Sequence, residues 1–127
     1  MVDLMDAPGT EPLRELARGV LLTEGVEPGE ATRVSGKLVA YARLLADWGS
    51  RLNLTGLRGA EAILAGLVVD SVLLGRALPG FMSLVDIGSG GGLPGIPLAL
   101  LFPERRFLLI EPRERRHHFL RHAIRVL

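Results

Sequence analysis

The sequence predicts a parallel α/β fold, with a helical region over residues 1–80 and the first half of a ligand-binding domain over 81–127. Two apolar runs of strand length, 84–87 and 107–110, flank a glycine-rich turn and a segment opened by Pro94, which suits the first turn of a helix. The first run is expected to be a buried strand. Such connections are almost always right-handed crossovers between parallel strands. Parallel sheets bind ligands beyond the carboxyl ends of their strands, so we expect the functional site there.

The composition excludes several classes of protein. Hydrophobic residues make up 48% of the 127 residues and aromatic residues only 5%, so a single modest core must be largely aliphatic. There is no cysteine, hence no disulfide framework or thiolate metal site. The net charge of +1 gives no global attraction to nucleic acid. No stretch has the length of a membrane span, and Asp3 and Asp6 argue against a signal peptide, so a cytoplasmic protein with no membrane partner is expected.

The first element after the start of the chain is predicted to be a helix. Residues 1–12 are polar and are expected to be a loose end. Apolar residues then recur at helical spacing over 13–21, and Gly25 is the predicted stop. We expect a loop over 24–29.

Two further helices are predicted before the first strand. One carries an apolar stripe in steps of four, three, four, three and four, which is the pattern of a helix that packs along one face. The stripe consists of Val34, Leu38, Tyr41, Leu45, Trp48 and Leu52. The other spans 60–78 and is apolar nearly all round, so we expect it to lie between two layers. Asp70 on this helix is therefore expected to be a buried structural acid that needs a partner.

The glycine turn indicates a small-molecule site. Four glycines in five positions, 88 and 90–92, allow positive φ angles and close approach of a ligand. A literal G-x-G-x-x-G begins at Gly90, which suggests a dinucleotide. However, Gly88 ends the strand, and counting from it places Leu93 where the third glycine belongs. The pattern that fits the strand end is Asp86-x-Gly88-x-Gly90-x-Gly92, with a second acid, Glu111, closing the next strand.

This arrangement resembles the S-adenosylmethionine site of class I, Rossmann-like methyltransferases. The resemblance is closest to one family, the small-subunit ribosomal RNA guanine-N7 methyltransferases, also called glucose-inhibited division protein B. The motifs that carry it are Asn53-Leu54-Thr55, Asp70-Ser71, the run from Val85 to Leu98 with its Gly-Leu-Pro-Gly-Ile-Pro, and Arg116-His117-His118-Phe119-Leu120. Together they span about 45–127.

The resemblance implies S-adenosylmethionine as cofactor and N7 of a guanine in 16S ribosomal RNA as the methyl acceptor. The implied cofactor-binding residues are Asp86, Gly88, Ser89, Gly90, Gly92, Leu93 and Glu111. Asp86 would help to hold the methionine amino group and Glu111 the two ribose hydroxyls. Attack in line with the methyl group needs no general base, and no catalytic residue is assigned. His118 and His122 have the spacing of two metal ligands but no third ligand, so no metal site is predicted.

An arginine-rich segment follows the second strand. From Arg105 to the end of the chain there are seven arginines and two acids. Arginine binds phosphate oxygens in a forked geometry, so the segment is a candidate contact for 16S ribosomal RNA or the small ribosomal subunit. The candidate residues are Arg113, Arg115, Arg116, Arg121 and Arg125. A solvated helix face that binds nothing is an equally weighted alternative.

Two departures from the resemblance leave alternatives open. Gly66 and Leu67 stand where the family carries an Arg-His pair, and Leu127 falls within the helix after the second strand. We therefore expect a truncated fold that binds S-adenosylmethionine weakly, does not methylate RNA alone, and can self-associate through exposed sheet edges. One alternative is a non-catalytic module that binds RNA or itself. Another is a fragment of an NAD-dependent oxidoreductase that uses Glu111 on the ribose.

Overall fold

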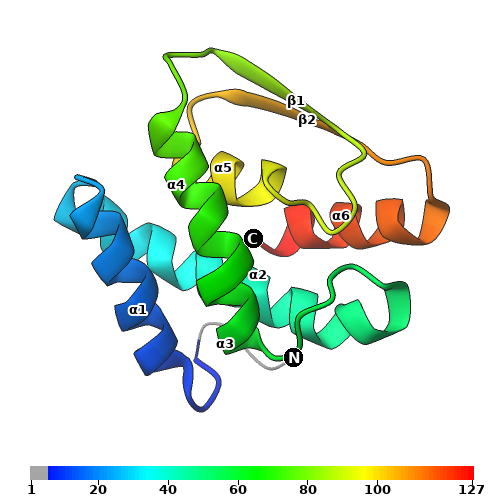
Figure 1. Ribbon diagram of the computed structural model, residues 1–127, viewed down its shortest axis with the longest axis horizontal. Coiled ribbons are helices and arrows are strands. Elements are labelled where there is room, and N and C mark those ends of the chain that lie inside the picture. Colours follow the sequence, from blue (N-terminus) through cyan, green and yellow to red (C-terminus); the bar gives the residue numbers. More distant parts are fainter. Residues whose placement is uncertain (1–5) are drawn as a thin grey trace.

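The computed structural model describes residues 6–127 (Figure 1). Its elements in chain order are α1 (Thr10–Thr23), α2 (Pro28–Leu52), α3 (Ala60–Ile63), the π-helical turn η1 (Leu64–Val68), α4 (Val69–Ala77), β1 (Ser83–Ile87), α5 (Gly95–Leu101), β2 (Arg106–Ile110) and α6 (Glu114–Val126). No helix within residues 6–127 is both long enough and apolar enough to cross a membrane.

The first two helices begin earlier than their apolar patterns indicate. Helix α1 starts at Thr10, inside the expected loose end, and Thr10 donates both its N–H and its hydroxyl to Ala7 O. Residues 1–5 of that expected loose end lie outside the described residues. The expected loop at 24–29 is wrong in its last two residues. There Glu27 caps α2 by accepting the N–H of Glu30 at 3.0 Å, and Pro28 occupies the first turn.

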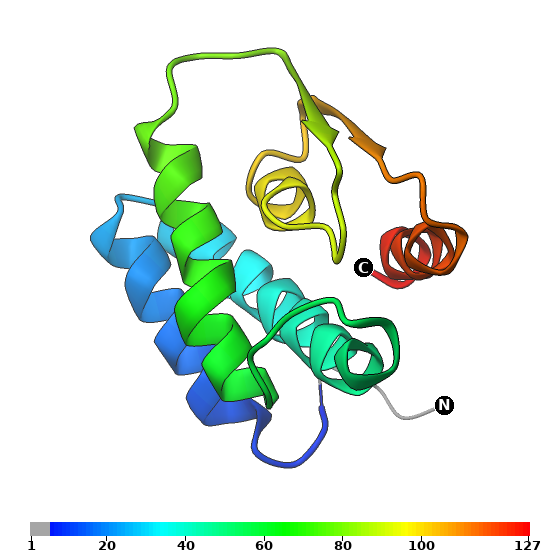
Figure 2. The same ribbon diagram turned by 45° about the vertical axis from the view of Figure 1, so that its right-hand side comes forward.

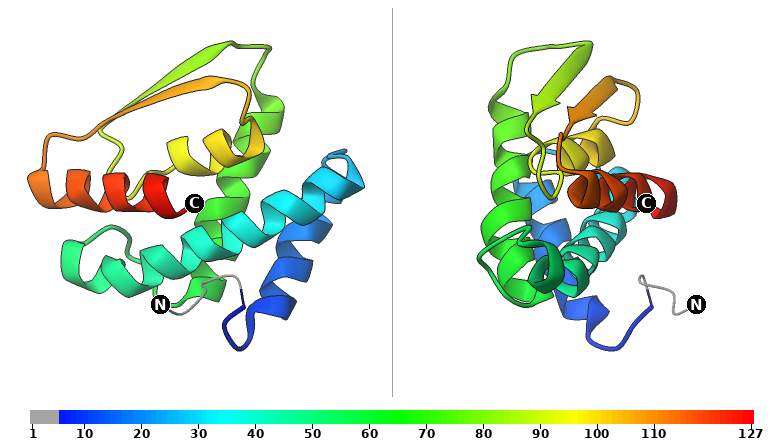
Figure 3. Two further views of the ribbon diagram at one scale, coloured as in Figure 1. Left: turned by 180° about the vertical axis from the view of Figure 1, so that it is seen from behind. Right: turned by 90° about the vertical axis from the view of Figure 1, so that its right-hand side faces the viewer.

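The predicted parallel crossover is confirmed. β1 and β2 form a parallel two-stranded sheet, in register from Ser83 opposite Arg106 to Ile87 opposite Ile110, and α5 connects them. Helices α5 and α6 lie against one face of the sheet, and α2 runs beneath them (Figures 1 and 3). No element of residues 6–127 covers the other face.

The prediction that the first strand is buried is therefore wrong, because three residues of β1 are exposed and the other two only half-buried. Successive side chains of a strand point to opposite faces. Leu84 and Asp86 lie on the covered face and are half-buried, whereas Val85 is 54% exposed and Ile87 is 80% exposed. The apolar run predicted a strand correctly, but a strand is buried on both faces only when both faces of its sheet are covered.

The long helix α2 lies at the centre of the molecule. Its predicted stripe is buried or half-buried throughout, and α1, α3, α5 and α6 all pack against it. The core is largely aliphatic, as predicted, with Tyr41 and Phe119 as its largest fully buried side chains. Trp48 contacts the rings of Phe119 and His122 at centroid distances of 5.9 and 5.5 Å, which joins α2 to α6.

The predicted helix at 60–78 is present, but it is not enclosed between layers. Elements α3, η1 and α4 form one continuous helical stretch whose buried face includes Ile63, Leu64, Val68 and Val72. Its opposite face is open, since Leu73 and Leu74 are 41% and 44% exposed. Asp70 is exposed as well, so the prediction of a buried acid is wrong.

Candidate functional site

The turn after β1, here called the glycine loop (residues 88–94), has the positive φ angles that its glycines were expected to allow. Strand β1 ends at Ile87, and Gly88, Gly90 and Gly92 have φ angles of +76°, +58° and +92°. L-residues with side chains rarely adopt such angles. These three glycines are the ones in the pattern counted from Gly88, which directly follows the last strand residue.

The inner side of the glycine loop is fixed to α2. Tyr41 donates its buried hydroxyl to Gly91 O at 2.6 Å. A Cβ at Gly91 would lie 2.8 Å from Leu45 Cδ2, so only glycine allows this close packing. Ser89 is 3% exposed and donates its hydroxyl to Asp86 O at 2.9 Å. Figure 2 shows the loop reaching down from β1 toward α2.

Tyr41 was predicted only as a member of the apolar stripe, and its contact with the loop was missed. Burial is the main cause that raises the pKa of Tyr41 well above its ordinary value, and the nearby Asp86 carboxylate adds to it. The phenol therefore stays protonated and remains a donor. The available signal was the single phenol in an aliphatic stripe, because a buried hydroxyl needs a partner.

Tyr41→Phe should lower the free energy of unfolding by about 1–2 kcal/mol, because the buried Gly91 carbonyl would lose its donor. Urea melts of the two proteins measure the difference. Thr23→Val is a matched control, since it removes an exposed hydroxyl that donates to Gly19 O and should cost only a few tenths of a kcal/mol. Equal effects of the two changes would contradict the role given to Tyr41.

The outer side of the glycine loop is open. A Cβ built at Gly88 would meet no atom within 4 Å, and one built at Gly90 would meet only Gly88 O, at 4.0 Å. Gly91 and Gly92 are buried, whereas Gly88 is exposed and Gly90 half-buried. A small ligand can therefore lie directly against the backbone at Gly88 and Gly90.

Glu111 joins the end of β2 to this open side. Its Oε2 accepts the N–H of Gly90 at 2.8 Å, and its Oε1 accepts the N–H of Arg113 at 3.0 Å. The hydrogen bonds from Arg113 and Gly90 lower the pKa of Glu111, with smaller contributions from the charges of Arg116 and Arg113. An ionised carboxylate has about four acceptor positions, so about two remain for a ligand.

The lowered pKa predicts the pH range over which this link persists. Because the folded-state pKa lies below the ordinary value of about 4.3, the stabilisation from the carboxylate is complete above that value and is lost as the pH falls through the lower one. The amide NMR signal of Gly90 should therefore stay constant from neutral pH to about 5 and move only below about 4.3. A midpoint above the ordinary value would contradict the two hydrogen bonds.

Asp86 and Leu93 lie at the helix side of the loop. Asp86 Oδ2 accepts the N–H of Gly95 at 3.2 Å, so the carboxylate faces the first residue of α5. Leu93 is half-buried beside a small hollow of about 260 Å³. The hollow is lined by Leu67, Asp70, Ser71, Leu74, Leu93 and Pro94. Leu67 thus lies next to the glycine loop.

The structure brings together three of the five predicted arginines. Arg113, Arg115 and Arg116 line one hollow at the start of α6. Arg116 donates to Asn53 O at 3.0 Å. Arg121 and Arg125 are exposed further along the helix, where Arg125 Nη2 lies 3.3 Å from His122 Nδ1.

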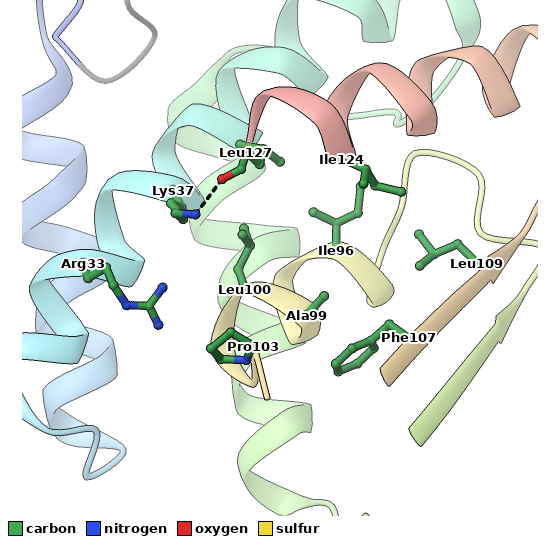
Figure 4. A pocket seen from close by; sticks show the side chains of 10 residues that line it. All are labelled: Arg33, Lys37, Ile96, Ala99, Leu100, Pro103, Phe107, Leu109, Ile124 and Leu127. Atoms are coloured by element: carbon green, nitrogen blue, oxygen red, sulfur yellow. Dashed lines mark hydrogen bonds between the residues drawn. The ribbon is translucent and has the colours of Figure 1, made fainter. Parts of the chain in front are cut away.

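A separate apolar groove of about 310 Å³ lies between α2, α5, β2 and α6 (Figure 4). Its cations are Arg33 and Lys37, and Lys37 Nζ donates to Leu127 O at 2.6 Å. Neither the glycine loop nor Glu111 lines this groove. The convergence of open backbone and carboxylate, rather than the size of a hollow, therefore defines the candidate site.

Known proteins are similar to the part of the chain that contains the candidate site. The model of the GidB family, described as rRNA small subunit methyltransferase G, matches residues 35–127. A ribosomal RNA small subunit methyltransferase G from Colwellia psychrerythraea is 41% identical over 87 residues, which cover 68% of this chain and 41% of that protein. The protein of the same name from Dichelobacter nodosus is 41% identical over 91 residues, covering 72% and 43%.

A third relative, the ribosomal RNA small subunit methyltransferase G of Cellvibrio japonicus, is 37% identical over 103 residues, which cover 78% of this chain and 46% of that protein. The chain thus spans less than half the length of each of these relatives. The matched residues include all of α5 and α6, both strands, the glycine loop and Glu111. The chain therefore belongs to the GidB family of ribosomal RNA small subunit methyltransferases.

Proposed function

We propose that this chain is the cofactor-binding part of a class I methyltransferase that uses S-adenosylmethionine to methylate N7 of a guanine in 16S ribosomal RNA. The observation that carries the proposal is the glycine loop, open on its outer side, with a carboxylate at the end of the neighbouring strand. Membership of the GidB family supports the reaction class.

The donor and acceptor groups of the site suit this cofactor. The remaining acceptor positions of Glu111 suit two neighbouring ribose hydroxyls. The open backbone at Gly88 and Gly90 suits the methionine part, with Asp86 and Leu93 beside it. Ser89 would contribute by shaping the loop, because its side chain is buried.

The same geometry argues against a nicotinamide dinucleotide. Dinucleotide sites place the pyrophosphate at the start of the helix after the glycine turn. Here the Asp86 carboxylate already accepts the N–H of Gly95, and the N–H of Ile96 is donated to Gly92 O. A negative charge occupies the position that a pyrophosphate would need.

The proposed reaction needs little acid–base chemistry from the protein. When bound, S-adenosylmethionine supplies a methyl group made electrophilic by a sulfonium. Guanine N7 carries a free lone pair at neutral pH, so no residue has to remove a proton. The residues of this chain would act by holding the reacting groups at close distance and by excluding other orientations.

Isothermal titration of the chain with S-adenosylhomocysteine, the product form of the cofactor, tests the proposal. Binding of S-adenosylhomocysteine and the absence of binding of NAD under the same conditions are the expected results. Binding of NAD with no heat from S-adenosylhomocysteine would overturn the proposal in favour of an oxidoreductase fragment.

A further inference from the structure

We propose that Arg51, Arg113, Arg115 and Arg116 form a binding site, here called the arginine pocket, for backbone phosphates of single-stranded RNA. The inference rests on the proposed function, because it specifies where the RNA substrate of that enzyme contacts this chain. Arg51 was not among the RNA-contacting residues predicted from sequence.

The arginine pocket lies where the end of α2 meets the start of α6. It is a hollow of about 310 Å³ lined by Arg51, Leu52, Asn53, Arg113, Glu114, Arg115 and Arg116. Figures 1 and 3 show these two helix ends at the same side of the molecule. Arginines that are more than sixty positions apart in the sequence thus line one hollow.

The charge of the arginine pocket is largely uncompensated. No carboxylate of residues 6–127 forms a salt bridge with any of its four arginines. Glu114 is the one acid in its lining. Arg116 is held by its hydrogen bond to Asn53 O, which offsets the exposed carbonyls at the end of α2. The other three arginines are exposed and available to a ligand.

The first turn of α6 favours the same kind of ligand. The helix is 13 residues long, and the residue that caps its start, Arg113, makes no side-chain capping hydrogen bond. The first backbone N–H groups of such a helix attract anions, and arginine adds forked hydrogen bonds to phosphate oxygens. Phosphate satisfies both kinds of donor.

The position of the arginine pocket explains why its ligand should be RNA. Arg113 donates its N–H to Glu111, whose other oxygen accepts from Gly90, so the pocket adjoins the glycine loop. The lowering of the Glu111 pKa by the charges of Arg116 and Arg113 is a second sign of this proximity. A strand bound by its phosphates in the pocket would present a base near the open side of the loop.

The test compares two double variants of equal charge change. Arg51→Gln/Arg115→Gln removes two members of the pocket, and Arg18→Gln/Arg106→Gln removes two exposed arginines that do not line it. Binding of a fluorescein-labelled single-stranded RNA is followed by anisotropy at several KCl concentrations, without methyl donor. Circular dichroism melts verify that each variant is folded.

The pocket variant should reduce the slope of log affinity against log salt by about 1.4, because each phosphate contact on a single strand contributes about 0.7. The control variant should keep the wild-type slope. Equal slopes in the two variants, or no RNA binding by the wild type at low salt, would overturn the inference. The inference would also be overturned if inorganic phosphate, at matched ionic strength, displaced the RNA and bound as tightly as the RNA does per phosphate group.

These results are separable from those of the cofactor titration. If the pocket variant keeps the wild-type salt slope while the chain still binds S-adenosylhomocysteine, only the arginine pocket is refuted. A slope change without any binding of S-adenosylhomocysteine refutes the proposed cofactor and leaves the phosphate site standing.

Discussion

Glu111→Gln is expected to lower the affinity of the chain for S-adenosylhomocysteine about ten- to a hundredfold. The carboxylate would accept two ribose hydroxyls, and hydrogen bonds to a charged group are worth about 1.5–3 kcal/mol. The glutamine amide keeps one acceptor oxygen, but its NH₂ group cannot accept a hydrogen bond from a backbone N–H. In the wild type the backbone donors are the N–H groups of Gly90 and Arg113. Calorimetric titration of both proteins measures the change.

Glu104→Gln is the matched control for this change. Glu104 is an exposed acid just before β2, at the opposite end of the strand from Glu111, and it pairs with Arg105 at 3.2 Å. Its loss should leave the affinity unchanged. If Glu111→Gln bound S-adenosylhomocysteine as tightly as the control does, the assignment of Glu111 to the ribose would be wrong.

Gly92→Ala is expected to lower the free energy of unfolding by about 2–4 kcal/mol, through a strained φ angle and overpacking together. At Gly92 the φ angle is +92°, and a Cβ would lie 2.5 Å from Ile96 Cδ1 and 2.8 Å from Ile96 Cγ1. Leu120 Cδ2 would be 3.1 Å away, so α5 and α6 both resist the added group. Urea melts of the variant and the wild type measure the loss.

Gly88→Ala separates the two causes. It has a similar φ angle of +76° but no atom within 4 Å of the added Cβ, so it should cost only the backbone strain of about 1 kcal/mol. Gly80→Ala, with open space and no positive φ, should be close to neutral. Equal losses for Gly92→Ala and Gly88→Ala would show that the loop does not pack on α5 and α6 as described.

The features that the sequence predicted well are local. The parallel crossover was predicted from two apolar strands separated by a glycine turn and a helix, and β1 and β2 do pair in parallel. The glycine turn was also predicted to allow positive φ angles, and three of its four glycines adopt them. The stripe of α2 was readable because its spacing holds over five steps.

The features that it did not predict depend on distant parts of the chain. Whether Val85 is buried depends on what covers its face of the sheet, which the strand itself does not specify. Asp70 lies on an apolar helix, but only the packing of that helix shows that its face is open. The contact of Tyr41 with Gly91, and the position of Arg51 beside the start of α6, join residues too far apart for any spacing rule.

The most direct test of the cofactor site is an amide NMR titration of the chain with S-adenosylhomocysteine. If the open side of the glycine loop is the binding surface, the signals of Gly88, Gly90 and Glu111 should move with saturation, and NAD should leave them in place. If those signals stay unchanged while others move, or if NAD moves them and S-adenosylhomocysteine does not, the loop is not the site of a methyltransferase cofactor.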